Sequence, residues 1–202
     1  EHQAVLQPLE RLRQTGSTVV TVPVDNAAVP RLRDLNRYVD PGSRLLALMH
    51  VNNETGGILD LAEAAAMARS HDLLFHVDMV QSAGKLPIDV KQVHVDFAAL
   101  SAHKLHGPKG VGALYIRSGR DVLPHLIGGA QERGRRGGTE NVAGIVGFGE
   151  AARIAMLECE HRREQWRRMR SQAVTMLKDE FAQVVINGER DAVLPSILSV
   201  SF

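Results

Sequence analysis

Two short polar segments each follow an apolar run that is typical of a buried strand. One contains Asp78 and Gln81, and the other contains Ser101, His103 and Lys104. A lysine amine forms a Schiff base with an aldehyde, and a buried carboxylate keeps a pyridine nitrogen protonated. Hydroxyl and imidazole groups bind phosphate. These residue types therefore predict a site for pyridoxal phosphate, with Lys104 on the aldehyde and Asp78 on the ring nitrogen.

The position of Lys104 supports this interpretation more than its residue type does. An isolated lysine is most often a solvated surface charge. However, residues 95–100 are apolar and are predicted to form a buried strand of a parallel sheet, so Lys104 follows a strand end. Asp78 takes the equivalent place on the preceding strand. Open α/β sheets bind ligands beyond the carboxyl ends of their strands, which is where both side chains are expected.

Other patterns of residues offer weaker alternatives. His103 and His106 form an H-x-x-H pair, but no carboxylate or thiolate cluster accompanies it, and no metal site is predicted. The glycines at 144, 147 and 149 do not follow a strand and indicate a helix face of small residues. Arginines at 133–136 and 162–170 leave open a basic module that binds nucleic acid or an acidic partner. Interleaved glutamates and the lack of an aromatic ladder argue against nucleic acid.

The composition favours a globular protein in a reducing compartment. The chain has 202 residues, 44% of them hydrophobic, a formal net charge of +1 and one cysteine. This balance gives no general attraction to nucleic acid or membranes, and a single cysteine excludes a disulfide scaffold. Neither a signal-peptide pattern nor an apolar run of about twenty residues is present. We therefore expect a cytoplasmic location and no membrane partner.

Apolar runs with strand character alternate with helical patterns along the chain. This alternation predicts an α/β fold with a mostly parallel sheet flanked by helices. Helices are expected at residues 1–15, after Pro30 and at 59–71. Strands are expected at residues 18–24, 44–51, 72–78, 95–100 and 111–116. Residues 126–141 read as a loop rich in glycine and arginine, and one or two long helices are expected from 142 to about 184.

Seven segments of the chain, taken in order, resemble the pyridoxal-phosphate cysteine desulfurases of the nitrogen-fixation and iron–sulfur assembly branch, within the class V aminotransferase superfamily. They are EHQAV (1–5), HVNNETG (50–56), HVDMVQ (76–81), GKLPID (84–89), SAHK (101–104), GPKG (107–110) and RGGTEN (136–141). The resemblance implies the fold type I large domain of these enzymes, truncated at both ends. It further implies an incomplete cofactor domain at residues 1–141, connecting helices at 142–183 and the start of a small domain at 184–202. The last two strands, at 184–186 and 197–202, are expected to lack partners.

The same resemblance implies a role for each site residue. Lys104 and His2 are the catalytic residues, with Lys104 carrying the cofactor and His2 stacking on its ring and transferring protons. A local hydrogen bond at a helix start is the alternative role for His2. The remaining cofactor contacts are Asp78 to the pyridine nitrogen, Asn53 and Gln81 to the phenolic oxygen, Ser101 and His103 to the phosphate, and Thr139 to the phosphate of the other subunit in a homodimer.

The implied activity is conversion of L-cysteine to L-alanine, with transfer of a persulfide sulfur to an iron–sulfur scaffold or another acceptor protein. A selenocysteine lyase or an aminotransferase of the same superfamily is the alternative. The family's nucleophilic cysteine would follow Phe202. Cys159 lies between Glu158 and Glu160, whose charges disfavour a thiolate, so it is predicted to be structural. The chain by itself is therefore expected to have little or no turnover.

Overall fold

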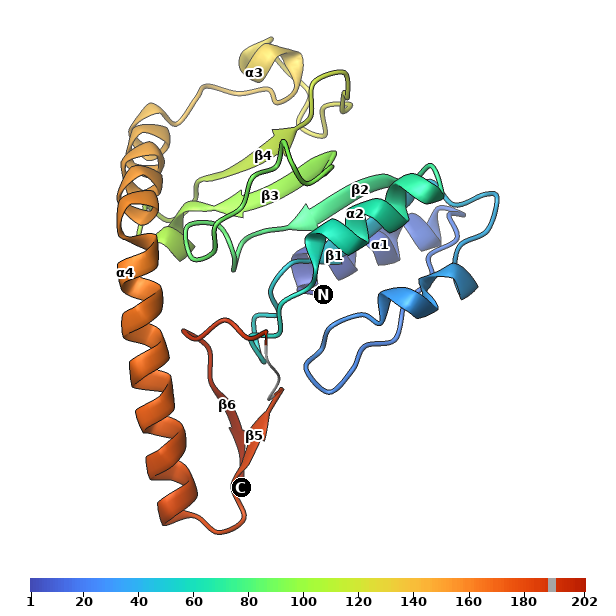
Figure 1. Cartoon of the computed structure of the whole chain (residues 1–202). Helices are drawn as coiled ribbons and strands as arrows, with labels where there is room; N and C mark the ends of the chain where they lie inside the picture. Colours follow the sequence, from blue (N-terminus) through green and yellow to red (C-terminus); the bar gives the residue numbers. More distant parts are fainter. Residues whose placement is uncertain (189–191) are drawn as a thin grey trace.

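The computed structural model describes residues 1–188 and 192–202. Its central element is a four-stranded sheet in the order β1-β2-β3-β4. The strands are β1 (Leu45–Met49), β2 (Leu74–Asp78), β3 (Phe97–Ser101) and β4 (Gly112–Ile116). The first three are parallel and β4 is antiparallel to β3 (Figure 1). The predicted α/β fold with a mostly parallel sheet is confirmed.

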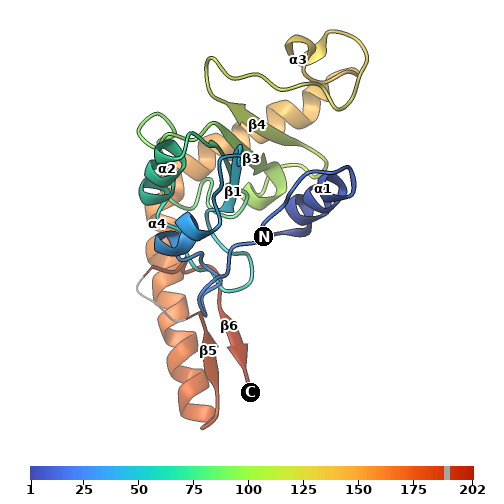
Figure 2. The same cartoon turned by 90° about the vertical axis from the view of Figure 1, so that its right-hand side faces the viewer.

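Six helical segments surround this sheet in the described chain. They are α1 (Gln3–Gln14), η1 (Leu32–Arg37), α2 (Leu61–Ser70), η2 (Ala102–Leu105), α3 (Gln131–Gly134) and α4 (Val142–Glu180), with η1 and η2 being 3₁₀ helices. Figure 2 shows α1 and α2 on opposite sides of the sheet. No helix within residues 1–188 and 192–202 is long and apolar enough to cross a bilayer.

The main core fills the space between the sheet and α2. Phe75 and Val77 of β2 are 0% exposed and lie in one cluster with Ala64 and Ala65 of α2. The small alanine side chains let the helix approach the strands closely, and Asp60 caps its start by accepting hydrogen bonds from the backbone amides of residues 62 and 63. Alternate strand residues point to the other face, because side chains alternate along a strand.

Polar groups fix the segment that leads into β3. Arg117 donates to three backbone carbonyls within residues 90–95. Asp96 is 5% exposed, accepts a hydrogen bond from the amide of Phe75 and pairs with Arg120 at 2.7 Å. A buried carboxylate with both a backbone donor and a guanidinium is well satisfied. These contacts set the register of β3 on β2 and therefore the place where β3 ends.

Helix α4 is a single helix of 39 residues, with Asn141 accepting a hydrogen bond at its start. Its first turns pack on η2, where Leu105 and Ala155 are buried in a second apolar cluster. A side-chain carbon at Gly147 would lie 2.7 Å from the Pro108 ring, so only glycine fits there. The three glycines lie in α4 as predicted, and one of them, Gly147, packs against the loop after Lys104.

Three sequence predictions are wrong in detail. Residues 18–24 form no strand, because Val24 makes only an isolated bridge with Pro30. The predicted loop at 126–141 contains the short α3, although Glu132 and Arg133 have positive φ angles that are not helical. The last two strands, β5 (Val185–Asn187) and β6 (Ser199–Ser201), do not lack partners: they pair with each other in an antiparallel ladder.

Candidate cofactor site

The parallel strands bring the predicted site residues to one edge of the sheet. Met49 at the end of β1 is paired with Asp78 at the end of β2, and Asp78 is paired with Ala99 of β3. Ser101 ends β3, and η2 follows at once with His103 and Lys104. The carboxylate of Asp78 and the Ser101–Lys104 segment therefore share the carboxyl edge, as the strand pattern predicts.

Asp78 is a buried carboxylate, and no salt bridge neutralises its charge within the described chain. It is 6% exposed, and its Oδ1 accepts a hydrogen bond of 2.9 Å from the amide of Val80. Burial lowers the pKa of His76, which points from the same face of β2, and the negative charge of Asp78 partly opposes this. A buried carboxylate is the group that retains a proton on a pyridine nitrogen, so this position fits the role predicted for Asp78.

Ser101 and His103 form a hydrogen-bonded pair. The Ser101 Oγ lies 2.8 Å from Nδ1 of His103. When the hydroxyl donates, the neutral imidazole carries its proton on Nε2, which then faces outward as a donor. His103 itself is exposed, whereas Lys104 beside it is half-buried. In this arrangement Nε2 of His103 is a donor suited to a phosphate, next to the amine that would carry the cofactor.

The start of α1 is fixed to the same edge. Glu1 Oε1 accepts a hydrogen bond of 2.6 Å from the amide of Met49. Burial raises the pKa of Glu1, that hydrogen bond opposes the effect, and the nearby charge of Asp78 raises the pKa further. His2 follows, and its Nδ1 accepts a hydrogen bond of 3.1 Å from the amide of Ala4. The local bond considered from the sequence is therefore present, and Nε2 of His2 is the ring atom left for other chemistry.

Asn53 and Gln81 lie in the turns that follow β1 and β2. Asn53 donates through Nδ2 to Glu54 at 2.7 Å, within a tight turn in which the amide of Asn52 donates to the carbonyl of Gly57. Gln81 accepts a hydrogen bond of 3.0 Å from Nζ of Lys85. Lys85 is not among the site residues predicted from the sequence, although the GKLPID segment contains it. Its only sequence signal is its place four residues after Gln81.

Thr139 lies apart from the other predicted residues. It is exposed and follows α3 in the segment that leads to α4. Figures 1 and 2 both show this segment at the end of the molecule opposite β5 and β6, beyond β4. No hydrogen bond within the described chain connects Thr139 with η2.

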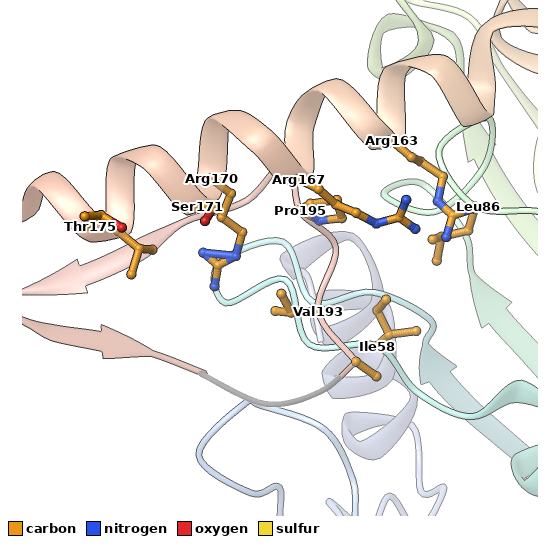
Figure 3. A pocket seen from close by; sticks show the side chains of 11 residues that line it. Ile58, Leu86, Arg163, Arg167, Arg170, Ser171, Thr175, Val193 and Pro195 are labelled. Carbon is orange, nitrogen blue, oxygen red and sulfur yellow. The ribbon is translucent and has the colours of Figure 1, made fainter.

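A separate cavity of about 590 Å³ lies between α4 and the segment around Pro195 (Figure 3). Three arginine side chains line it, at positions 163, 167 and 170. Arg163 and Arg167 pair with glutamates on their own helix, which reduces the positive charge available for a nucleic acid. None of the predicted cofactor residues lines this cavity. Within residues 1–188 and 192–202, no three His, Cys, Asp or Glu side chains gather to hold a metal ion.

Comparisons with known proteins agree with this arrangement. The chain is 40% identical over 202 residues to the cysteine desulfurase IscS of Dictyoglomus turgidum and 38% identical to a cysteine desulfurase of Nostoc sp.. These matches cover 100% of this chain but 51% and 50% of those proteins, so the chain spans about half the length of the curated relatives it matches.

Solved structures give the same result. A NifS-like protein matches with a TM-score of 0.95 and 41% identity, covering 100% of this chain and 55% of that one. DndA from Streptomyces lividans matches with a TM-score of 0.92 and 36% identity, covering 100% and 57%. A model of the aminotransferase class-V family matches residues 1–202. The chain therefore belongs to the class-V aminotransferases, a family of pyridoxal-phosphate-dependent enzymes.

Proposed function

We propose that this chain forms the cofactor-binding part of a cysteine desulfurase, which converts L-cysteine to L-alanine and passes on the sulfur as a persulfide. One observation carries the proposal. The pairing of Asp78 with Ala99 brings a buried carboxylate to the sheet edge from which Ser101, His103 and Lys104 follow. The names of the relatives, which match over the whole of this chain, support the choice of reaction.

Each of these residues is proposed to bind a different group of the cofactor. Lys104 binds its aldehyde, Asp78 keeps the pyridine nitrogen protonated, and the Ser101–His103 pair donates to the phosphate. Bound in this way, pyridoxal phosphate supplies an electron sink for the substrate amino acid. The burial of Asp78 is favourable because a carboxylate opposite a protonated ring nitrogen interacts more strongly in a medium of low dielectric constant.

Three further residues orient the ring and move protons. Asn53 and Gln81 donate to the phenolic oxygen through their amide groups. His2 stacks on the ring and exchanges protons with the substrate through Nε2, because its Nδ1 is occupied at the start of α1. The hydrogen bond between Glu1 and the amide of Met49 holds this histidine close to the strand edge.

Thr139 is proposed to act between two subunits. We propose a homodimer in which Thr139 of one chain binds the phosphate held by Lys104 of its partner. The exposed position of Thr139 supports this arrangement. An iron–sulfur scaffold or another sulfur-acceptor protein in the cytoplasm is the proposed destination of the sulfur.

Cys159 is not the proposed sulfur nucleophile. It lies in the middle of α4, half-buried, between two glutamates that are paired with arginines of the same helix. A nucleophilic thiolate requires an electropositive and accessible environment, which this position lacks. The mobile thiolate that attacks the substrate sulfur is therefore proposed to belong to residues outside this chain.

Cofactor trapping tests the site directly. The protein, expressed with whatever residues adjoin the chain in its gene, is incubated with pyridoxal phosphate and reduced with borohydride. Peptide mapping is expected to find the label on Lys104, and a label confined to other lysines contradicts the assignment. Release of sulfide and alanine from L-cysteine then separates a desulfurase from an aminotransferase, and parallel assays with L-selenocysteine separate it from a selenocysteine lyase.

A further inference from the structure

We infer that Lys85 is a positioning residue of this site: its ammonium group fixes the amide of Gln81 so that the amide NH₂ faces the cofactor's phenolic oxygen, and its charge acts on Lys104. The inference rests on the proposed function, since it concerns how the cofactor is held. It assigns a role to a side chain that is not among the predicted cofactor contacts.

The hydrogen bond between the two side chains determines the orientation of the amide. Nζ of Lys85 donates to Oε1 of Gln81 at 3.0 Å. An ammonium group has donors only, and the oxygen is the only acceptor of an amide, so the reverse orientation would lose this bond. The NH₂ group of Gln81 donates no hydrogen bond within the described chain. It therefore remains free as a donor, which is the group that a phenolate oxygen needs.

A close approach between two distant segments brings Lys85 to this position. Gly84 has φ +66°, and a side-chain carbon there would lie 2.6 Å from Leu105 and 2.8 Å from Ala155. Leu105 directly follows Lys104 in η2. The turn at residues 82–85 is closed by a hydrogen bond of 3.0 Å from the amide of Lys85 to the carbonyl of Ser82. The bare glycine thus lets the turn pack on the helix that carries Lys104.

The two lysines influence each other through their charges. Lys85 is half-buried, and burial lowers its pKa, with the positive charge of Lys104 lowering it further. A charged Lys85 would also repel a positive charge on the nitrogen through which Lys104 would hold the cofactor, because like charges repel each other. Donation from Gln81 to the phenolic oxygen acts in the same direction, because it makes that oxygen a weaker acceptor for the proton on that nitrogen.

A pH titration of the cofactor absorption band measures this effect without requiring turnover. The unmodified protein, Lys85→Met and Lys85→Arg are loaded with pyridoxal phosphate, and the midpoint of the spectral change is followed. We expect Lys85→Met to raise the midpoint by about one pH unit, because a nearby charge and a hydrogen bond are both lost. Lys85→Arg, which keeps the charge and the donors, is expected to stay within about 0.3 unit of the unmodified protein. Lys91→Met removes an exposed lysine and serves as the matched control.

A double variant that combines Lys85→Met with Gln81→Leu separates the direct effect of the Lys85 charge from the effect that Lys85 exerts through the amide of Gln81. If Lys85 acts partly through the amide, Lys85→Met shifts the midpoint less in the Gln81→Leu background than in the unmodified protein. Equal shifts in both backgrounds overturn the positioning role. If Lys85→Met does not fold, Lys85→Gln, which lacks the charge, replaces it with an expected rise of about half a unit.

The outcomes distinguish this inference from the proposed function. A protein that binds no pyridoxal phosphate at all refutes the proposed function and the inference together. A protein that binds the cofactor normally but shows the same midpoint in Lys85→Met and Lys91→Met refutes the inference alone. A raised midpoint that Lys85→Arg does not restore also contradicts it, because both charge and donor are then present without their expected effect.

Discussion

His50 is expected to make the stability of the fold depend on pH, and replacing it with glutamine is expected to remove much of this dependence. The residue begins the turn that carries Asn53 and is 6% exposed. Its Nδ1 is buried and has no hydrogen-bond partner among the described residues. Burial in these surroundings lowers the pKa of His50 to about 4. The folded protein therefore keeps this imidazole neutral over most of the acidic range.

The size of the effect follows from the two protonation equilibria. In the unfolded chain His50 takes up a proton as the pH falls through about 6.5, whereas in the folded chain it does so only near pH 4. Between these values the unfolded state binds more protons, so the free energy of unfolding decreases as the pH falls. From pH 7 to pH 5 the expected loss is about 2 kcal/mol for this side chain. His76, whose pKa is also lowered, contributes in the same direction and remains in the variant.

Urea unfolding at pH 7, 6 and 5 measures this contribution. The unmodified protein, His50→Gln and the control His161→Gln, which removes an exposed histidine, are compared at the same ionic strength. The unmodified protein and the control are expected to lose stability in parallel, while His50→Gln loses about 2 kcal/mol less over this range. Parallel losses in all three proteins would refute the reasoning, because His50 would then not be neutral in the folded state.

Three further substitutions test the proposed cofactor contact, the proposed role of Cys159 and the packing of the turn beside Lys104. Asp78→Ala is expected to weaken binding of pyridoxal phosphate at least tenfold in an equilibrium titration, because a buried charged partner of the ring nitrogen is lost. In the protein expressed with the residues that adjoin this chain in its gene, Cys159→Ser is expected to leave desulfurase turnover within about twofold, whereas a complete loss of sulfide release would make Cys159 the nucleophile. Gly84→Ala is expected to lower the free energy of unfolding by about 1–3 kcal/mol in urea, since a side chain there clashes with Leu105.

The sheet edge at which Asp78 and the Ser101–Lys104 segment meet could be predicted because it depends on strand ends. The apolar residues before Asp78 and Ser101 are recognisable as buried strands, and parallel strands in one sheet end at one edge. Both the buried strands and their common edge can be recognised without knowledge of side-chain contacts. The hydroxyl–imidazole pair at Ser101 and His103 is also local, since the two residues are two positions apart.

Strand pairing could not be predicted in the same way. Residues 18–24 have the composition of a strand, but a strand also needs a partner, and Val20 and Val24 remain 51% exposed. For β5 and β6 the prediction of unpaired strands is wrong in the opposite sense. They pair with each other, and the side chain of Asn187 donates to hydroxyl groups at both Ser199 and Ser201. Alternation of residues shows which segments are extended but not which of them meet.

The role of Lys85 was hidden for a related reason. Its interaction with Lys104 depends on the approach of Gly84 to Leu105, two segments that are distant in the sequence. A glycine in a turn usually indicates backbone freedom alone, and the sequence does not reveal which residue passes close to it. Only the packed structure identifies this glycine as the contact that brings the two lysines together.

The backbone at the sheet edge couples two parts of the proposed site. The amide of His50 donates to the carbonyl of Asp78 at 3.0 Å, and the carbonyl of His50 accepts a hydrogen bond of 2.8 Å from Leu59. The turn that carries Asn53 is thus attached to the same residue whose carboxylate is proposed to meet the ring nitrogen. A change that loosens this turn should displace Asp78 as well as Asn53, so their effects on cofactor binding are not expected to be additive.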